Sequence, residues 1–223
     1  MPPLLDSCRA VSERAAQTLK WANQAREASL LTIALDHLTL GRAALYAAIL
    51  EGRAELPRRL SASSSSPATP AAQQRSPTDD GFVAARRELD AAVSGLRRAG
   101  QQDHIPRGLL TRAWLRFLTG ARTGPESAQS DLDEAWEIAA RGPMPLFLAD
   151  IHLHRACLFF HEQPYPWNKN PDGTPRGPED DLAAARKIIT KATSFQRDGV
   201  TIQHSYLRRL PGLEDAERAL LGS

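Results

Sequence analysis

The sequence predicts an all-α fold and, more narrowly, an α-solenoid made of antiparallel helix pairs. The pattern L-x-R-A-x-L occurs three times, and the pattern A-x-x-x-L-x-x-A occurs three times with leucine and once with isoleucine in its place. Each copy of the first pattern follows a copy of the second at one constant distance. No stretch alternates polar and apolar residues for long enough to predict a strand. Two patterns in a constant register are an internal repeat, and a repeat of this size is typical of stacked helices.

We name the two patterns by their residues. The alanine–leucine pattern is formed by Ala15/Leu19/Ala22, Ala85/Leu89/Ala92, Ala128/Leu132/Ala135 and, with isoleucine, Ala185/Ile189/Ala192. The arginine pattern is formed by residues 40–45, 110–115 and 153–158. The first alanine of one pattern precedes the alanine of the other by 28 residues in all three pairs. The repeat unit is therefore expected to be two antiparallel helices.

The N-terminal part of the chain predicts two helices and a long insertion. The helices are expected over Leu5–Ala28 and Ser29–Leu50, with Gly52 as a stop signal after the second. The serine- and proline-rich stretch that follows has no apolar periodicity. It offers too little apolar area to offset the cost of ordering. We therefore expect a flexible insertion at about 54–77.

The helical periodicity resumes at a capping cluster near residue 78. The helices expected next are 78–99, Pro106–Thr119, Gly124–Arg141, Pro145–Glu162 and Glu179–Arg197. Proline suits the first turn of a helix, where its missing N–H has no partner to lose. Turn-rich sequence predicts a second flexible insertion at about 163–178. A short helix at about 213–221 is expected to cap the C-terminal end.

Both insertions follow a helix of the arginine pattern, so we expect them at one edge of the solenoid. The chain 1–223 is expected to form a single helical-repeat domain. The first helix carries the alanine–leucine pattern but has no helix of the arginine pattern before it. A stacked array needs capped ends, so this helix is either a built-in cap or a remnant of a longer array.

Composition excludes several classes of protein. The chain has 223 residues, of which 42% are hydrophobic, which is enough for a sizeable core. A net charge of +2 gives no case for nucleic acid as a partner. We find no targeting leader and no apolar run of membrane-spanning length, so we expect a cytoplasmic protein without a membrane partner. Cys8 and Cys157 lie in helical patterns and are expected to be reduced and buried.

The alanine–leucine helix followed by a proline-containing turn resembles the second helix of a tetratricopeptide repeat (TPR). The segments 36–43 and 102–110 resemble TPR regions at the C-terminal ends of large bacterial signalling proteins. The repeat departs from that family because it is 43 residues or longer, against about 34 for a TPR. HEAT-like or armadillo-like repeats are the alternative.

The resemblance implies a non-catalytic interaction module or scaffold that binds a peptide or partner protein in a groove. One alternative is an oligomerising sensor arm of a larger bacterial signalling or defence system, and a homo-oligomer is compatible with either. Another alternative is a binder of an acidic small ligand or nucleic acid.

Arg42, Arg112 and Arg155 occupy equivalent positions of the arginine pattern. In a regular stack they form a row that could contact the carboxylates or phosphates of a partner. The competing interpretation is structural: each arginine forms an ion pair with a helix carboxylate such as Asp90 or Asp133. Those two aspartates are equivalent to each other, which favours the structural interpretation.

The second insertion carries Tyr165 and Trp167, which either anchor a partner or fold back onto the helices. Neither a nucleophile motif nor a phosphate loop nor a metal-binding motif occurs, so we expect no catalytic residue, no metal and no cofactor. His152 and His154 are two residues apart on a helix and point to different faces. Surface or capping positions are expected for the histidines.

Overall fold

The computed structural model describes residues 2–25, 27, 29–62, 77–170 and 172–193. Its helices are α1 (Pro2–Gln24), α2 (Leu30–Ala62), α3 (Pro77–Ala99), α4 (Ile105–Leu118), α5 (Ala128–Arg141), α6 (Pro145–Phe159) and α7 (Pro178–Thr193). Over these residues the only β-type pairing is one isolated bridge, between Lys169 and Pro175. The all-α prediction is confirmed for the described part of the chain, whereas the α-solenoid stays a prediction.

The chain divides into two compact units, Met1–Leu115 and Arg116–Ser223, and the boundary falls inside α4. We call them the N-terminal and C-terminal units. The expected single domain stays a prediction.

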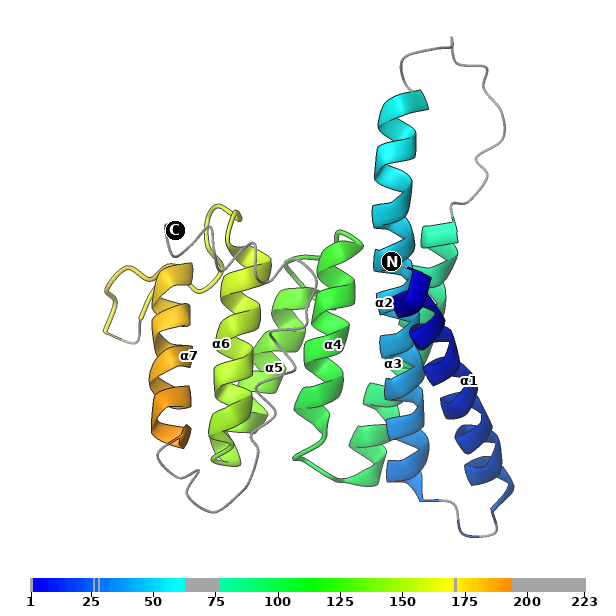
Figure 1. The fold of residues 1–223 in the computed structure, drawn as a ribbon. Coiled ribbons are helices and arrows are strands. Elements are labelled where there is room, and N and C mark those ends of the chain that lie inside the picture. The colour runs from blue at the N-terminus through cyan, green and yellow to red at the C-terminus, as the bar shows by residue number, and fades with distance from the viewer. Residues whose placement is uncertain (1, 26, 28, 63–76, 171, 194–223) are drawn as a thin grey trace. The chain divides into compact units, whose positions relative to one another are not determined.

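In the N-terminal unit, α2 and α3 are antiparallel neighbours (Figure 1). They pack against each other through small residues. A Cβ added to Gly81 would lie 2.8 Å from the Cβ of Ala48, and one added to Gly95 would lie 2.8 Å from the Cβ of Ala34. Midway along α2, a Cβ on Gly41 would lie 2.7 Å from the Leu89 side chain. Ala34, Gly41 and Ala48 are seven residues apart, so they form a small-residue stripe on one face of α2. Gly81 and Gly95 of α3 lie opposite the two ends of this stripe, so the two backbones approach closely.

The alanines of the repeat are core residues in both units. The fully buried ones are Ala85, Ala92, Ala113, Ala128, Ala135, Ala156 and Ala185. The repeat alignment predicts that Ala113 and Ala156 are buried at helix–helix contacts, and their complete burial confirms this. On α1 the same pattern is less covered, since Ala15 is buried but Leu19 and Ala22 are only partly buried.

In the C-terminal unit, α6 packs against both α5 and α7. Ser127 caps α5: its hydroxyl accepts from the backbone N–H of Ser130, whose own hydroxyl accepts from the N–H of Ser127. The helix begins at Ala128, whereas the sequence predicted a start at Gly124. Gly124 and Glu126 have positive φ angles of 92° and 52°, which a right-handed helix excludes.

The first insertion is shorter than predicted. α2 continues through Gly52 to Ala62, so the first part of the expected loop at 54–77 is helical. A single glycine inside a helix costs only about 1 kcal/mol, so it need not end the helix. Residues 63–76, the expected helical positions beyond Thr193 and the expected capping helix at 213–221 lie outside the described residues.

By length and composition alone, the segment Leu30–Gly52 of α2 is long and apolar enough to cross a membrane. This corrects the expectation that no apolar run approaches such a length. A core helix of a soluble protein meets the same criterion, and the small-residue stripe of this segment packs against α3. The cytoplasmic location and the absence of a membrane partner stay predictions.

Candidate functional site

The same aspartate–arginine contact recurs in both units. Arg112 Nη1 lies 3.1 Å from Asp90 Oδ1, and Arg155 Nη2 lies 3.1 Å from Asp133 Oδ1. Both pairs span 22 residues of sequence. The two arginine side chains are only 11% and 6% exposed. For Arg112 and Arg155 the structure therefore contains the ion pairs of the structural interpretation, and the guanidinium groups are not displayed on an open surface.

Arg42 departs from this arrangement. The position equivalent to Asp90 and Asp133 is occupied by Lys20, and two cations do not pair. Arg42 turns instead to the start of α4, where its Nε donates to Thr111 Oγ1 (3.0 Å) and its Nη2 donates to the carbonyl of Arg107 (3.3 Å). The three arginines of the predicted row therefore differ in their contacts. Arg112 and Arg155 form ion pairs, whereas Arg42 donates hydrogen bonds to α4.

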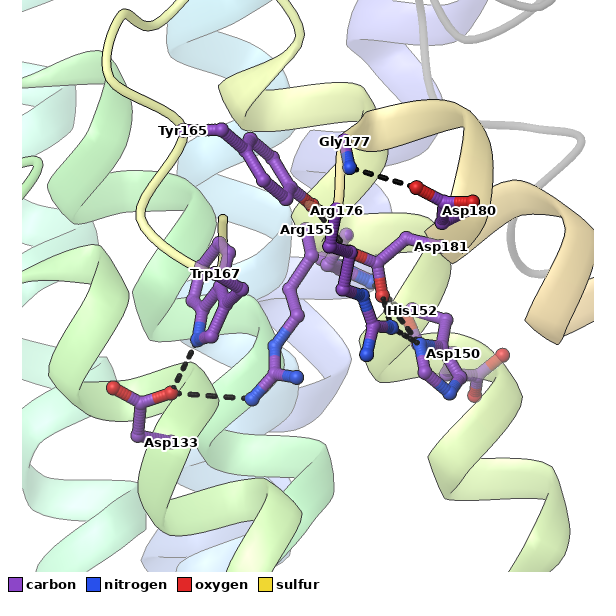
Figure 2. Close-up of polar contacts among 11 residues, drawn as sticks. Asp133, Asp150, His152, Arg155, Tyr165, Trp167, Arg176, Gly177, Asp180 and Asp181 are labelled. Atoms are coloured by element: carbon purple, nitrogen blue, oxygen red, sulfur yellow. Dashed lines mark hydrogen bonds and ion pairs between the residues drawn. The ribbon is translucent and has the colours of Figure 1, made fainter. Parts of the chain in front are cut away.

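In the C-terminal unit the repeated ion pair is extended by tryptophans. The Arg155 guanidinium lies over the ring of Trp136 at 4.8 Å and over the ring of Trp167 at 4.5 Å. Trp167 Nε1 also donates to Asp133 Oδ1, at 2.7 Å, so that this oxygen accepts from both neighbours (Figure 2). Cation–π contacts of this kind are strongest where water is excluded.

Asp181, in the first turn of α7, is the centre of a second buried cluster. Its Oδ1 lies 2.5 Å from His152 Nδ1 and 2.5 Å from Arg176 Nη2, and its Oδ2 accepts from the Tyr165 hydroxyl (Figure 2). Because a carboxylate only accepts, His152 carries its hydrogen on Nδ1. The start of a helix also favours a negative charge.

The electrostatics of the cluster follow from these contacts. Burial raises the pKa of the Asp181 carboxyl, but hydrogen bonds from His152 and Tyr165 and the charge of Arg176 outweigh it, so the pKa is lowered overall. Burial, followed by the Asp181 charge, raises the pKa of Tyr165, which therefore stays a hydrogen-bond donor. Burial lowers the pKa of Arg155, and the charges of Asp133 and Asp181 oppose this shift.

Both clusters are closed by the second insertion, whose residues 163–177 we call the strap. Tyr165 is only 5% exposed, and Trp167 is partly buried against Phe159, with ring centroids 5.1 Å apart. The outer part of the strap is paired within itself, because the N–H of Asn170 donates to the carbonyl of Thr174 at 2.9 Å. Tyr165 and Trp167 therefore fold back onto the helices, which was the second of the two interpretations.

The two clusters form one network of hydrogen bonds and ion pairs, buried at Asp181, His152, Arg155 and Tyr165 and partly exposed at Asp133. His152 is buried, so the expectation of a surface or capping position is wrong for this histidine. Among the described residues, no group of three or more histidine, cysteine, aspartate or glutamate side chains is placed to hold a metal ion. The network can fix a segment of chain in place and recognise its side chains.

Sequence reasoning missed His152, Arg176 and Asp181. His152 and Asp181 are 29 residues apart, and neither position recurs in the repeat as a histidine or an aspartate. No motif connects them. The only signal was the run of three acidic residues at the predicted start of α7, which is also a common capping feature.

Replacing Arg112 or Arg155 by alanine is expected to lower the free energy of unfolding by about 1 kcal/mol. Each substitution removes a partly screened ion pair and an apolar stem that covers the core. Thermal and urea unfolding measure the effect. Arg98, an exposed arginine on α3, is the control, and its alanine variant should unfold like the wild type. Unchanged stability of the first two variants would contradict the structural role.

Comparison of the chain with models of known protein families finds no matching family, and comparisons with curated proteins and with solved structures also find no match.

Proposed function

We propose that this chain is a non-catalytic, TPR-like helical-repeat module that binds a peptide or a partner protein. The observation that carries the proposal is the recurrence of one Asp–Arg contact, at the same sequence separation and the same distance, in both units. A contact repeated in this way marks a repeated supersecondary unit. Proteins built from such units use extended surfaces of stacked helices for binding.

The chemistry of the C-terminal unit supports recognition of a peptide. Its helices offer two carboxylates, Asp133 and Asp181, and the flat face of the Arg155 guanidinium beside aromatic rings. Aromatic side chains with a polar tip are the groups that such surroundings bind best, because an apolar ring and a donor are satisfied together. The strap already places a tyrosine and a tryptophan there.

The test is a selection of binding peptides from a displayed random library against the purified full chain. Selected peptides are synthesised and titrated by calorimetry. We expect saturable one-to-one binding that is lost when the peptide sequence is scrambled. Binding through an apolar and aromatic surface should weaken only slightly with salt, whereas binding through phosphate-gripping arginines would weaken steeply.

The selection is run in parallel on the wild type and on a Trp167→Ala variant, which loses one anchor of the strap. Failure of every selected peptide to bind either protein saturably would overturn the proposed function.

A further inference from the structure

The strap contacts the helices in the manner of an extended peptide ligand. Tyr165 precedes a proline, which restricts its backbone to the extended region. In extended chain, residues two apart point to the same side, and the rings of Tyr165 and Trp167 are indeed neighbours, with centroids 5.6 Å apart. Two aromatic anchors therefore enter one face of the C-terminal unit from a single short segment.

Each anchor has a defined acceptor on the helices. Trp167 Nε1 donates to Asp133 on α5, and the Tyr165 hydroxyl donates to Asp181 on α7. Between them, Arg155 of α6 stacks on the Trp167 ring. Further along the strap, Arg176 donates to Asp181 at 2.5 Å. Three helices contribute to this face (Figure 2). Its side chains contact two aromatic residues in aromatic–x–aromatic spacing and one basic residue of the strap.

The closed arrangement also carries a cost. The Nε atoms of Arg155 and Arg176 are both buried, and neither has a hydrogen-bond partner among the described residues. A buried donor without an acceptor loses the hydration it has in water, which disfavours the state that buries it. Opening the strap would return both groups to water, so its docking is weaker than its contacts alone indicate.

We infer that the strap is an intramolecular occupant of a peptide-binding face formed by α5, α6 and the start of α7. A partner peptide with two aromatic residues in Tyr-x-Trp spacing takes its place when the strap opens. This inference rests on the proposed function and names the site and the partner chemistry. The strap then acts as an autoinhibitory contact, because a tethered segment competes at an effective concentration in the millimolar range for short flexible linkers.

The test uses a fluorescein-labelled synthetic peptide of residues 163–177 and the full-length chain. Fluorescence anisotropy compares the wild type with the double variant Tyr165→Ala/Trp167→Ala, whose own strap lacks both anchors. We expect the double variant to bind the peptide at least about tenfold more tightly than the wild type, since the tethered competitor is removed. A control peptide with alanine at both aromatic positions should bind neither protein.

A third substitution maps the site. Adding Asp133→Ala to the double variant removes the oxygen that accepts from the peptide's tryptophan, and this substitution should weaken binding of the peptide again. Equal affinity of the wild type and the double variant, or no saturable binding to a folded double variant, would overturn the inference.

A milder variant covers the case in which circular dichroism shows the double variant to be unfolded. Trp167→Leu keeps an apolar side chain and removes only the N–H donor and the aromatic ring. It should bind the labelled peptide more tightly than the wild type, and affinity equal to the wild type would contradict the inference. Library-selected peptides that bind the wild type and the strap variants equally would leave the proposed function standing and exclude the strap as occupant.

Discussion

Replacing Asp181 by alanine is expected to lower the free energy of unfolding by about 3–5 kcal/mol, because it removes one side of a buried charged network. The carboxylate is fully buried and accepts from His152, Tyr165 and Arg176. Without it, the Arg176 guanidinium and the buried donors of His152 and Tyr165 lose their shared acceptor, and a small cavity remains. Urea unfolding followed by circular dichroism measures the loss. Because Tyr165 and Arg176 belong to the strap, the amide protons of the strap should also exchange faster in the Asp181→Ala variant than in the wild type.

The matched control is Glu179→Gln, an exposed carboxyl in the same turn of α7. Its stability should stay within about 0.5 kcal/mol of the wild type, as for most surface substitutions. An Asp181→Ala variant as stable as this control would show that the network contributes nothing to the fold.

The pH dependence of the effect has a definite sign. The folded-state pKa of Asp181 is lowered, so its contribution is complete above the pKa of an unfolded aspartate, about 3.9. The contribution is lost as the pH falls from there through the folded-state pKa. The difference in stability between the wild type and an Asp181→Asn variant should therefore shrink as the pH falls below about 4. A difference that grows over that range would contradict the assignment.

Replacing Gly95 by leucine is expected to lower the free energy of unfolding by about 2 kcal/mol. A side chain there meets Ala34 of α2, with its Cβ 2.8 Å from the Ala34 Cβ and 3.4 Å from the Ala34 Cα. One of the atoms met is backbone, so the helices must move apart, at the upper end of the usual overpacking cost of about 1–3 kcal/mol. The higher helix propensity of leucine offsets about 1 kcal/mol of this. Thermal unfolding measures the net effect.

Ser94→Leu is the control for that substitution, because Ser94 is the preceding residue of α3 and is exposed. The same side chain should cost little at this position. If Gly95→Leu were as stable as Ser94→Leu, the close approach of α2 and α3 would be wrong.

Much of the helical framework followed from local patterns. The constant distance between the two patterns predicted that Ala113 and Ala156 are buried, because a residue's place on a helix face depends on its position in the sequence. The same register also put Asp90 opposite Arg112 and Asp133 opposite Arg155 as possible ion pairs. Local signals were weaker at helix ends. Gly52 predicts a stop, yet α2 passes through it, because a single glycine costs only about 1 kcal/mol in a helix and is not enough to end one.

By itself, then, the sequence determined that the described part of the chain is helical, that Ala113 and Ala156 are buried, and which charges can pair between the two helices of one repeat unit. Those properties depend on residues a few turns apart or on a repeated spacing. Only the tertiary structure decided where the strap lies and which side chains hold it in place. His152, Tyr165, Arg176 and Asp181 come from α6, the strap and α7, and the contacts among them follow no period. The turn-rich composition of the strap predicted an irregular segment, but its docking depends on acceptors that two other helices supply.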